Sequence, residues 1–477
     1  MEYKENVKID ALMKYEEINV ESNNDQLIDL SFSDSANLIS QNLLNPENSN
    51  KIQDLTELTK LIREYPIVLT SETMKCLFSL ISTENPEINN LALCAIRRIL
   101  KYPSKNHDFI FENNFQLMIL DLVSQSNLHF FRICTNFATS SRLFRNFLLE
   151  SNIFKIIKPF FDMGPEFLTS LAKFLPSFLD NSFDFETYGE QLAELFLLLV
   201  SHIKSADAKA GFYIVVAIRL FIRYDRNFLI LFAEHLTFED FFNFEASDTE
   251  YTQVLIELLT FIVRTSNEEE KHHFNEILWL SSQKVVQYIS LQLKGGYSDV
   301  PKLSLRFLSY LIFIDPNEIE SIYKYEIPSY LFQQLHKEEF DSLSPEMKIE
   351  IIHFFINLLS FATHPMFRQL QRIGIFDFLC DHLLDMPIND TFFALNIIKR
   401  TFNGNTKENN LISQSLAQKS ELKEWLQILL DDDEEEQEEE IKHLSSEIWN
   451  LIFPKDQKKE DEKEEEEDSV DDIEDFI

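Results

Sequence analysis

The side chains best suited to chemistry are scattered along this sequence. His272, His273 and Glu276 form one small group that could in principle hold a metal ion. Adjacent residues on a helix point about 100° apart, however, so the two imidazoles cannot bind one ion together. Cys380 lies two residues before His382, but so common a pair does not predict a cysteine nucleophile. We therefore expect no metal site and no catalytic cysteine.

Motifs of the common enzyme classes are absent from the sequence. It contains no GxGxxG or GxxxxGK[ST] phosphate loop, no GxSxG nucleophile turn and no HExxH zinc motif. Its adjacent glycines, Gly295 and Gly296, fit a helix end and a turn better than a phosphate loop. We predict a protein that has no catalytic residues, is not an enzyme and binds no cofactor.

The charge of the chain limits its partners. The 477 residues include 80 Asp and Glu against 43 Lys and Arg, a formal net charge of −37. Asp431–Ile477 holds 23 acids and 5 bases, a net charge of −18. Nucleic-acid binding needs a cationic face that releases counterions from the phosphates. We therefore expect no nucleic-acid partner.

Hydropathy and cysteine usage predict the compartment. No apolar run approaches the roughly 20 residues that a membrane-spanning helix needs, and the first residues lack the pattern of a secretory signal. We expect no membrane association and a cytoplasmic or nuclear location. Four cysteines lie far apart without paired spacing, which favours a reducing compartment: Cys76, Cys94, Cys134 and Cys380.

One pattern recurs at intervals of about 40 to 50 residues. It consists of a small or polar turn followed by a helix with apolar residues at i, i+3, i+4 and i+7. PEINNLALCAIRRIL from Pro86 and LSPEMKIEIIHFFINLLSF from Leu343 are two clear copies. Further copies begin at Ser49, Asn127, Gly164, Ser205, Ser247, Tyr297, Ile388 and Glu438.

Two shorter apolar segments lie between successive copies of this helix. Glu112–Val123, Ser151–Asp162 and Arg372–Leu384, which contains Gly374, show the second of them. Three helices per repeat is typical of armadillo units, whereas HEAT units have two. Each helix is apolar over too wide a face to be stable alone, so neighbouring repeats must bury it. We predict an all-α fold, a right-handed superhelical α-solenoid of about ten armadillo-type repeats.

The predicted solenoid covers residues 34–453. Residues 1–33 are polar without a sustained period, and we expect a flexible segment there. Residues 454–477 cannot bury enough apolar area to offset the entropy of ordering, so we expect a disordered acidic tail. Asp431–Glu440, a second acidic run, is expected in a loop between the last two helices.

Two segments resemble the importin-α family of nuclear transport adaptors. Residues 57–100, ELTKLIREYPIVLTSETMKCLFSLISTENPEINNLALCAIRRIL, are similar to that family's first armadillo unit, its linker and the start of the second unit. IKHLSSEIWNLIF at residues 441–453, followed by an acidic tail, is similar to its carboxyl end. The resemblance implies a non-enzymatic adaptor in nuclear protein import, with nuclear transport receptors among its partners.

In importin-α proteins, the third helix of successive repeats carries a Trp and, four residues later, an Asn, both lining a concave groove. The Asn amides hold the backbone of an extended cargo peptide, and the Trp rings sandwich its lysines. A mid-helix Asn can instead bond a carbonyl within the stack, so both roles are open. The resemblance assigns the peptide-binding role to Asn136, Asn357, Asn396 and Asn450.

The tryptophan half of this pattern is missing. The residues four positions earlier are Arg132, His353, Phe392 and Ser446, and none of Trp279, Trp425 and Trp449 occupies such a position. A lysine-rich signal would lose several cation–π contacts of about 0.5–2 kcal/mol each. The chain also lacks, at its amino end, the Arg-rich segment through which the family binds importin-β. The resemblance therefore implies altered ligand choice.

Basic residues share the groove phase in several third helices. Arg98, Arg132, Lys173 and Arg306 form a candidate site for an acidic or phosphorylated peptide; a solvated helix face is the alternative. The acidic tail could itself fold back onto such a site. Ser469, in an acidic setting, is a candidate phosphosite for an acidophilic kinase such as casein kinase II.

Two functions therefore stay open. The first is an importin-α-like adaptor that holds an extended peptide or partner in the concave groove. The second is a general armadillo scaffold or regulator that binds a folded, acidic or phosphorylated partner.

Overall fold

A computed structural model describes most of the chain. Every regular element in the described ranges is a helix, as predicted, and the helices divide into two compact units. None of the described helices is long and apolar enough to cross a membrane. The described residues are 30–45, 49–64, 69–101, 105–125, 127–180, 182–235, 241, 249–265, 282–295, 299–337, 343–402, 420–431 and 438–453.

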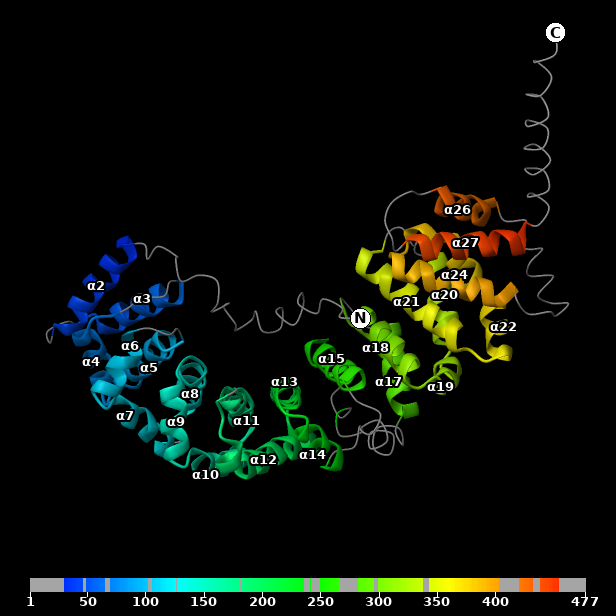
Figure 1. Cartoon of the computed structure of the whole chain (residues 1–477). Helices are drawn as coiled ribbons and strands as arrows, with labels where there is room; N and C mark the ends of the chain where they lie inside the picture. Colours follow the sequence, from blue (N-terminus) through cyan, green and yellow to red (C-terminus); the bar gives the residue numbers. More distant parts are fainter. Residues whose placement is uncertain are drawn as a thin grey trace, which may run out of the picture. The chain divides into compact units, whose positions relative to one another are not determined.

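The first unit comprises residues 1–202 and 223–225. Its helices follow one another in chain order, from blue to cyan in Figure 1. They are α2 (Leu30–Leu44), α3 (Lys51–Glu64), α4 (Ser71–Leu80), α5 (Pro86–Ile99), α6 (Lys105–Glu112), α7 (Phe115–Asp121), α8 (Leu128–Ser140), α9 (Arg142–Glu150), α10 (Ile153–Ile157), α11 (Pro165–Phe174) and α12 (Phe185–Ser201), with short 3₁₀ turns η1 (Leu122–Gln125), η2 (Lys158–Met163) and η3 (Leu175–Phe178).

The second unit comprises residues 203–222 and 226–477. The 3₁₀ turn η4 (His202–Ser205) and helix α13 (Ala208–Tyr224) include residues of both units. The further helices are α14 (Asn227–His235), α15 (Thr249–Thr265), α17 (Ser282–Gly295), α18 (Val300–Ile314), α19 (Glu318–Lys324), α20 (Ile327–Lys337), α21 (Pro345–Phe361), α22 (His364–Ile373), α23 (Ile375–Asp381), α24 (Ile388–Phe402), α26 (Ser420–Asp431) and α27 (Glu438–Ile452), with the 3₁₀ turn η8 (Leu383–Asp385).

The recurring sequence pattern corresponds to ten helices in the described ranges, each beginning within three residues of its predicted copy. We call them the third helices, because two shorter helices precede them in repeats such as α6–α8, α9–α11, α19–α21 and α22–α24. Most consecutive third helices pack on one another within each unit, which is the stacking expected of an α-solenoid, and α13 is joined to α15 through the side chains of Arg219 and Glu257. They are α3, α5, α8 and α11 in the first unit, and α13, α15, α18, α21, α24 and α27 in the second.

Capping residues determine where several third helices begin. The Asn85 side chain accepts hydrogen bonds from the backbone nitrogens of Glu87 and Ile88, at 3.0 and 3.3 Å, and Pro86 opens the helix. Ser344 caps α21 in the same way, ahead of Pro345. These side chains satisfy backbone N–H groups that have no partner within the helix, and proline has no such group to satisfy.

The turn between α22 and α23 requires the predicted glycine. Gly374 has φ +100°, a conformation that L side chains rarely adopt. A Cβ added there would lie 2.7 Å from Cζ of Phe332 in α20. The positive φ and the close ring therefore both disfavour a side chain at this turn.

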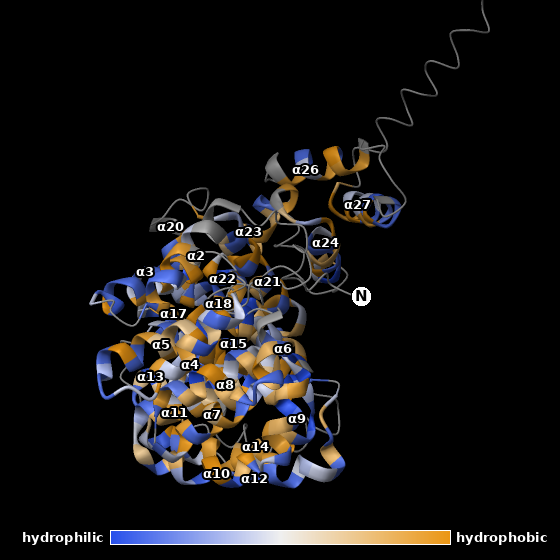
Figure 2. Ribbon diagram, turned by 90° about the vertical axis from the view of Figure 1, so that its left-hand side faces the viewer, coloured by the Kyte–Doolittle hydropathy of each residue, from blue (hydrophilic) through white to orange (hydrophobic). Residues whose placement is uncertain are grey.

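Aromatic side chains fill much of the core between the helices. The rings of Phe137 in α8 and Phe144 in α9 stack with centroids 4.0 Å apart, and both residues are fully buried. Phe131 in α8 meets Phe174 in α11 edge to face. In Figure 2 the helices carry both apolar and polar segments, as expected where one side of each helix is buried.

The predicted boundaries coincide only in part with the described helices. Helix α2 begins at Leu30, inside the segment 1–33, and α27 ends just before the predicted tail. Of the acidic run Asp431–Glu440, the ends belong to α26 and α27, and residues 432–437 lie outside the described ranges. The tail with Ser469, the group His272, His273 and Glu276, and Trp279 also lie outside the described residues.

Two leucines of helix α9 provide a test of the packing. Leu148 is fully buried, whereas Leu143 is 64% exposed. Leu148→Ala should lower the free energy of unfolding by about 2–5 kcal/mol, because it removes buried methyl groups and leaves a cavity. Leu143→Ala should change it by less than about 0.5 kcal/mol. Urea denaturation followed by circular dichroism measures both values, and equal losses would contradict this packing.

Candidate functional site: the polar faces of the third helices

Polar side chains join several third helices to a neighbour about one repeat away in sequence. Nδ2 of Asn136 in α8 donates a hydrogen bond to the carbonyl oxygen of Arg97 in α5, at 2.9 Å. Nδ2 of Asn357 in α21 donates to the carbonyl oxygen of Ser309 in α18, at 3.2 Å. Both bonds satisfy a backbone carbonyl on the preceding third helix, so these asparagines have a structural role.

The four candidate asparagines are not equivalent. Asn136 and Asn357 use one N–H to bond the preceding helix, and an amide has a second N–H and a carbonyl oxygen besides. Asn396 instead donates to the carbonyl oxygen of Phe392 in its own helix, at 2.9 Å. Asn450 is exposed on α27. Only Asn136 and Asn357 therefore bond the preceding third helix, which is the structural alternative to a role in binding peptide.

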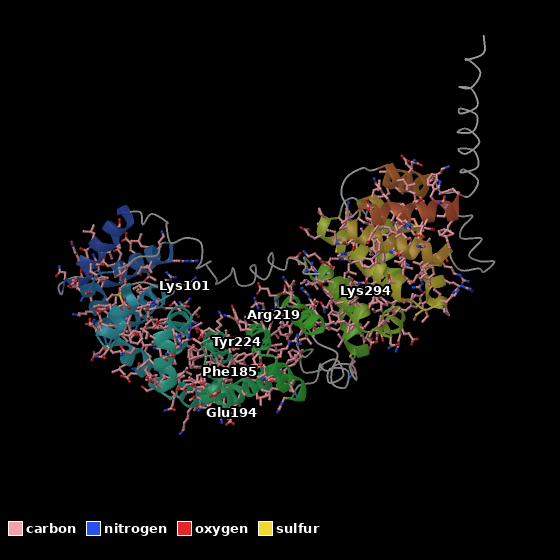
Figure 3. All side chains as sticks on the ribbon, in the orientation of Figure 1. Lys101, Phe185, Glu194, Arg219, Tyr224 and Lys294 are labelled. Atoms are coloured by element: carbon pink, nitrogen blue, oxygen red, sulfur yellow. The ribbon has the colours of Figure 1, made fainter. Side chains whose placement is uncertain are left out.

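Ion pairs join successive third helices of the second unit. Arg219 in α13, labelled in Figure 3, lies 2.7 Å from Glu257 in α15. Nε of Arg306 in α18 lies 2.7 Å from Oε1 of Glu350 in α21. Two further pairs, His353 with Asp390 and Lys399 with Glu447, join α21 to α24 and α24 to α27. In all four pairs the base is on the earlier helix and the acid on the next.

Burial gives three of these four pairs a structural role, whereas Lys399 and Glu447 are both partly exposed. Glu350 and Asp390 are buried, and burial raises the pKa of Glu257 despite the opposing charge of Arg219. Removing one partner of a buried pair leaves an uncompensated charge, which typically costs about 3–5 kcal/mol. Arg306, a candidate for binding an acidic peptide, is thus bound to Glu350, and its charge is balanced within the chain.

His353 occupies the position where the importin-α pattern has a tryptophan. Its Nε2 lies 2.8 Å from Oδ2 of Asp390. Burial alone would lower the pKa of His353, but the contact with Asp390 and the charge of Glu350 raise it above its ordinary value. This side chain therefore connects two repeats electrostatically. Phe392, at the equivalent position of α24, is half-buried against Phe393.

Several arginines on the third helices of the first unit form no ion pair in the described part of the chain. Arg98 donates a hydrogen bond from Nη1 to the carbonyl oxygen of Thr59 in α3. Arg132 is exposed on α8, and Lys173 is half-buried on α11. Within the described ranges, Arg63, Arg97 and Arg132 form no ion pair. Three of the four predicted basic residues therefore lie in the first unit, and Arg306 lies in the second.

Exposed aromatic side chains beside Asn357 were not predicted as site residues. Phe313 in α18 is 65% exposed and Phe361 in α21 is 37% exposed, and their rings meet edge to face with centroids 6.2 Å apart. Asn357 lies one helical turn before Phe361, and its bonded carbonyl at Ser309 immediately precedes Tyr310. We call Tyr310, Phe313, Asn357 and Phe361 the aromatic strip. Its signal in the sequence is two phenylalanines near the carboxyl ends of successive third helices.

One tryptophan does contact a lysine, but within the last repeat. Nζ of Lys423 in α26 lies 5.3 Å from the ring centroids of both Trp449 and Phe453. This cation–π contact joins α26 to the carboxyl end of the stack. Trp449 therefore contacts a lysine of this chain, whereas the importin-α pattern uses its tryptophans to contact lysines of the cargo.

Comparison with known proteins supports the fold alone. No protein-family model and no curated protein sequence matches the chain. The crystal structure of an engineered protein is similar over 87% of this chain and 98% of its own, with 13% identity and a TM-score of 0.60. A chain from a structure concerning a phosphorylation switch in the interaction between cadherin and β-catenin covers 87% of this chain and 82% of its own, with 12% identity. Its TM-score of 0.49 is too low to support a conclusion about this chain.

The His353–Asp390 contact should make stability depend on pH. Because the pKa of His353 is raised in the folded state, its stabilisation is fully present below the unfolded-state pKa and is lost as pH rises through the folded-state pKa. His353→Gln should therefore lower the free energy of unfolding by about 1.5 kcal/mol at pH 5.5, and by less at pH 8.5.

Urea titrations at the two pH values measure this difference. His364→Gln, at an exposed position of α22 in the same unit, is the matched control and should show little change at either pH. An equal cost of His353→Gln at both pH values would show that the charge on the imidazole does not contribute.

Proposed function

We propose that this protein is a non-enzymatic adaptor that binds an extended peptide of a partner protein along the third helices of its second unit. The observation that carries the proposal is the aromatic strip, which combines two exposed phenylalanines with an anchored amide. Exposed aromatic side chains that cluster on a soluble protein are typical of interaction sites. The α18–α21 pair positions all four residues of the strip.

The strip offers both kinds of contact that an extended peptide needs. Phe313 and Phe361 are already partly buried, so covering them with a ligand would contribute only a part of the about 1.5–3 kcal/mol that burial of a fully exposed side chain gives. Asn357 is held by its bond to Ser309, so an amide group of fixed orientation lies beside the rings. Such an amide can bond peptide backbone groups, which are the same for every sequence. Affinity would then come from the rings and register from the amide.

The importin-α resemblance suggests nuclear import as the process, with a cytoplasmic and nuclear distribution. The charges of the second unit argue against the usual lysine-rich ligand. Arg264 already lies over the Tyr310 ring, with Cζ 5.9 Å from its centroid, and would repel a lysine there. His353, which replaces a tryptophan, is engaged with Asp390. We therefore propose a peptide with apolar side chains as the ligand of the strip.

A general scaffold for a folded partner is the second candidate. The observation that favours it is apolar exposure on a helix outside the third-helix row: Leu291 in α17 is 61% exposed. A folded partner would cover several helices of a repeat, whereas an extended peptide would follow the third helices only.

Selection from a phage-displayed library of random dodecapeptides on the full chain tests the proposal. Enriched peptides should bind Phe313→Ala/Phe361→Ala at least about tenfold more weakly, because truncating a central aromatic contact typically costs more than 1 kcal/mol. Leu291→Ala, which removes an apolar side chain of the same unit about as exposed as Phe313, should change binding less than about twofold.

Failure to enrich any peptide would contradict the proposal. A larger loss with Leu291→Ala than with the double variant would favour the scaffold for a folded partner. Circular dichroism of each variant checks that the helices are intact.

A further inference from the structure

We propose that the first unit binds an acidic peptide segment of a partner protein across helices α3, α5 and α8. The side chains that would bind it are Arg63, Arg97, Arg98 and Arg132, which we call the arginine row. The row and the aromatic strip belong to different units, so this inference and the proposed function can fail separately.

Hydrogen bonds hold the three helices together at the arginine row. Helix α3 packs on α5, and α5 packs on α8. Arg98 bonds the carbonyl oxygen of Thr59 in α3, and the amide of Asn136 in α8 bonds the carbonyl oxygen of Arg97. The backbone on either side of the row is therefore fixed, and Arg132 lies one helical turn before Asn136 on the same side of α8.

No acidic side chain of α5 or α8 balances the row. Helix α8 contains no Asp or Glu, and the single acid of α5 is Glu87, in its first turn. Ten residues separate Glu87 from Arg97, which corresponds to about 15 Å along a helix. In the second unit, by contrast, each of four third-helix bases has an acid on the next third helix. Helix α3 does carry acids, Asp54 and Glu57 among them, but no arginine of the row forms an ion pair within the described residues, unlike the four bases of the second unit.

The charges of the row act on one another. Burial is the largest cause that lowers the pKa of Arg98. The charges of Arg63 and Arg97 lower this pKa further, and Cys94 raises it. Burial also lowers the pKa of His129 in α8, and the charges of Arg132 and Arg97 add to this effect. These effects link α3, α5 and α8 into one positive cluster on a chain with a net charge of −37. Carboxylates of a ligand would relieve this mutual repulsion.

The spacing suits an extended peptide. Axes of packed helices are about 8–10 Å apart, and an extended chain presents alternate side chains on one face about every 6.6–6.8 Å. Glutamates at alternate positions would therefore reach Arg97 and Arg132 within a few residues of each other. Single-stranded nucleic acid is disfavoured, because its binding also uses aromatic side chains for base stacking. The aromatic rings of α8 are buried, and α3 and α5 have none.

Fluorescence anisotropy with a defined probe tests the inference. The probe is a fluorescein-labelled dodecapeptide of alternating glutamate and serine, titrated with the full chain at low ionic strength. Arg97→Glu/Arg132→Glu should weaken binding at least about tenfold, because two attractive charges become repulsive. Arg142→Glu/Lys155→Glu makes the same charge change at exposed positions of α9 and α10, and should weaken binding less than about threefold.

Four outcomes would overturn the inference. The first is no measurable binding of the peptide to the wild-type chain. The second is an equal loss in both double variants, which would indicate attraction to net charge alone. The third is equally tight binding of a single-stranded oligonucleotide of the same length. The fourth is a rise of more than about fivefold in affinity when residues 454–477 are removed, since the acidic tail would then be the ligand of the row.

Discussion

The contacts that join one third helix to the next are the constraint on which the rest of the structure depends. A helix that is apolar over a wide face is stable only when a neighbour covers that face, so every repeat needs the one before it. Apolar packing alone would allow neighbouring helices to slide. Asn136, Asn357 and the four ion pairs of the second unit add directional contacts at intervals of about one repeat, and these fix the register.

This constraint explains why the two units differ on the same helices. In the second unit, the bases of α13, α18, α21 and α24 are used to hold the next repeat. The groups of that unit that could still contact a ligand are the exposed rings of the aromatic strip and the amide of Asn357. In the first unit, an arginine can instead bond a backbone carbonyl of the neighbouring helix, as Arg98 bonds the carbonyl oxygen of Thr59. Positive charge is therefore left for a ligand. One repeated architecture thus supports two surfaces of different chemistry.

The sequence predicted the helices far better than their polar contacts. Apolar periodicity, with caps such as Asn85 before Pro86, defines a helix within a few residues, because both signals are local. The partner of Arg306 lies 44 residues away, and no local pattern shows that Glu350 rather than Glu346, the other acid of α21, would meet it. The resemblance placed Asn136 and Asn357 correctly on third helices, but it could not show that each already bonds a carbonyl. The sequence did not indicate that Phe313 and Phe361 are exposed, because exposure depends on packing that spacing alone does not determine.

A double-mutant cycle on Arg306 and Glu350 tests most directly whether such pairs join the repeats. The free energies of unfolding of the wild-type chain, Arg306→Ala, Glu350→Ala and the double variant give the coupling energy of the pair. Our account predicts about 1–3 kcal/mol, because Glu350 is buried and accepts hydrogen bonds from Arg306. Additive single effects, with a coupling energy below about 0.3 kcal/mol, would contradict it.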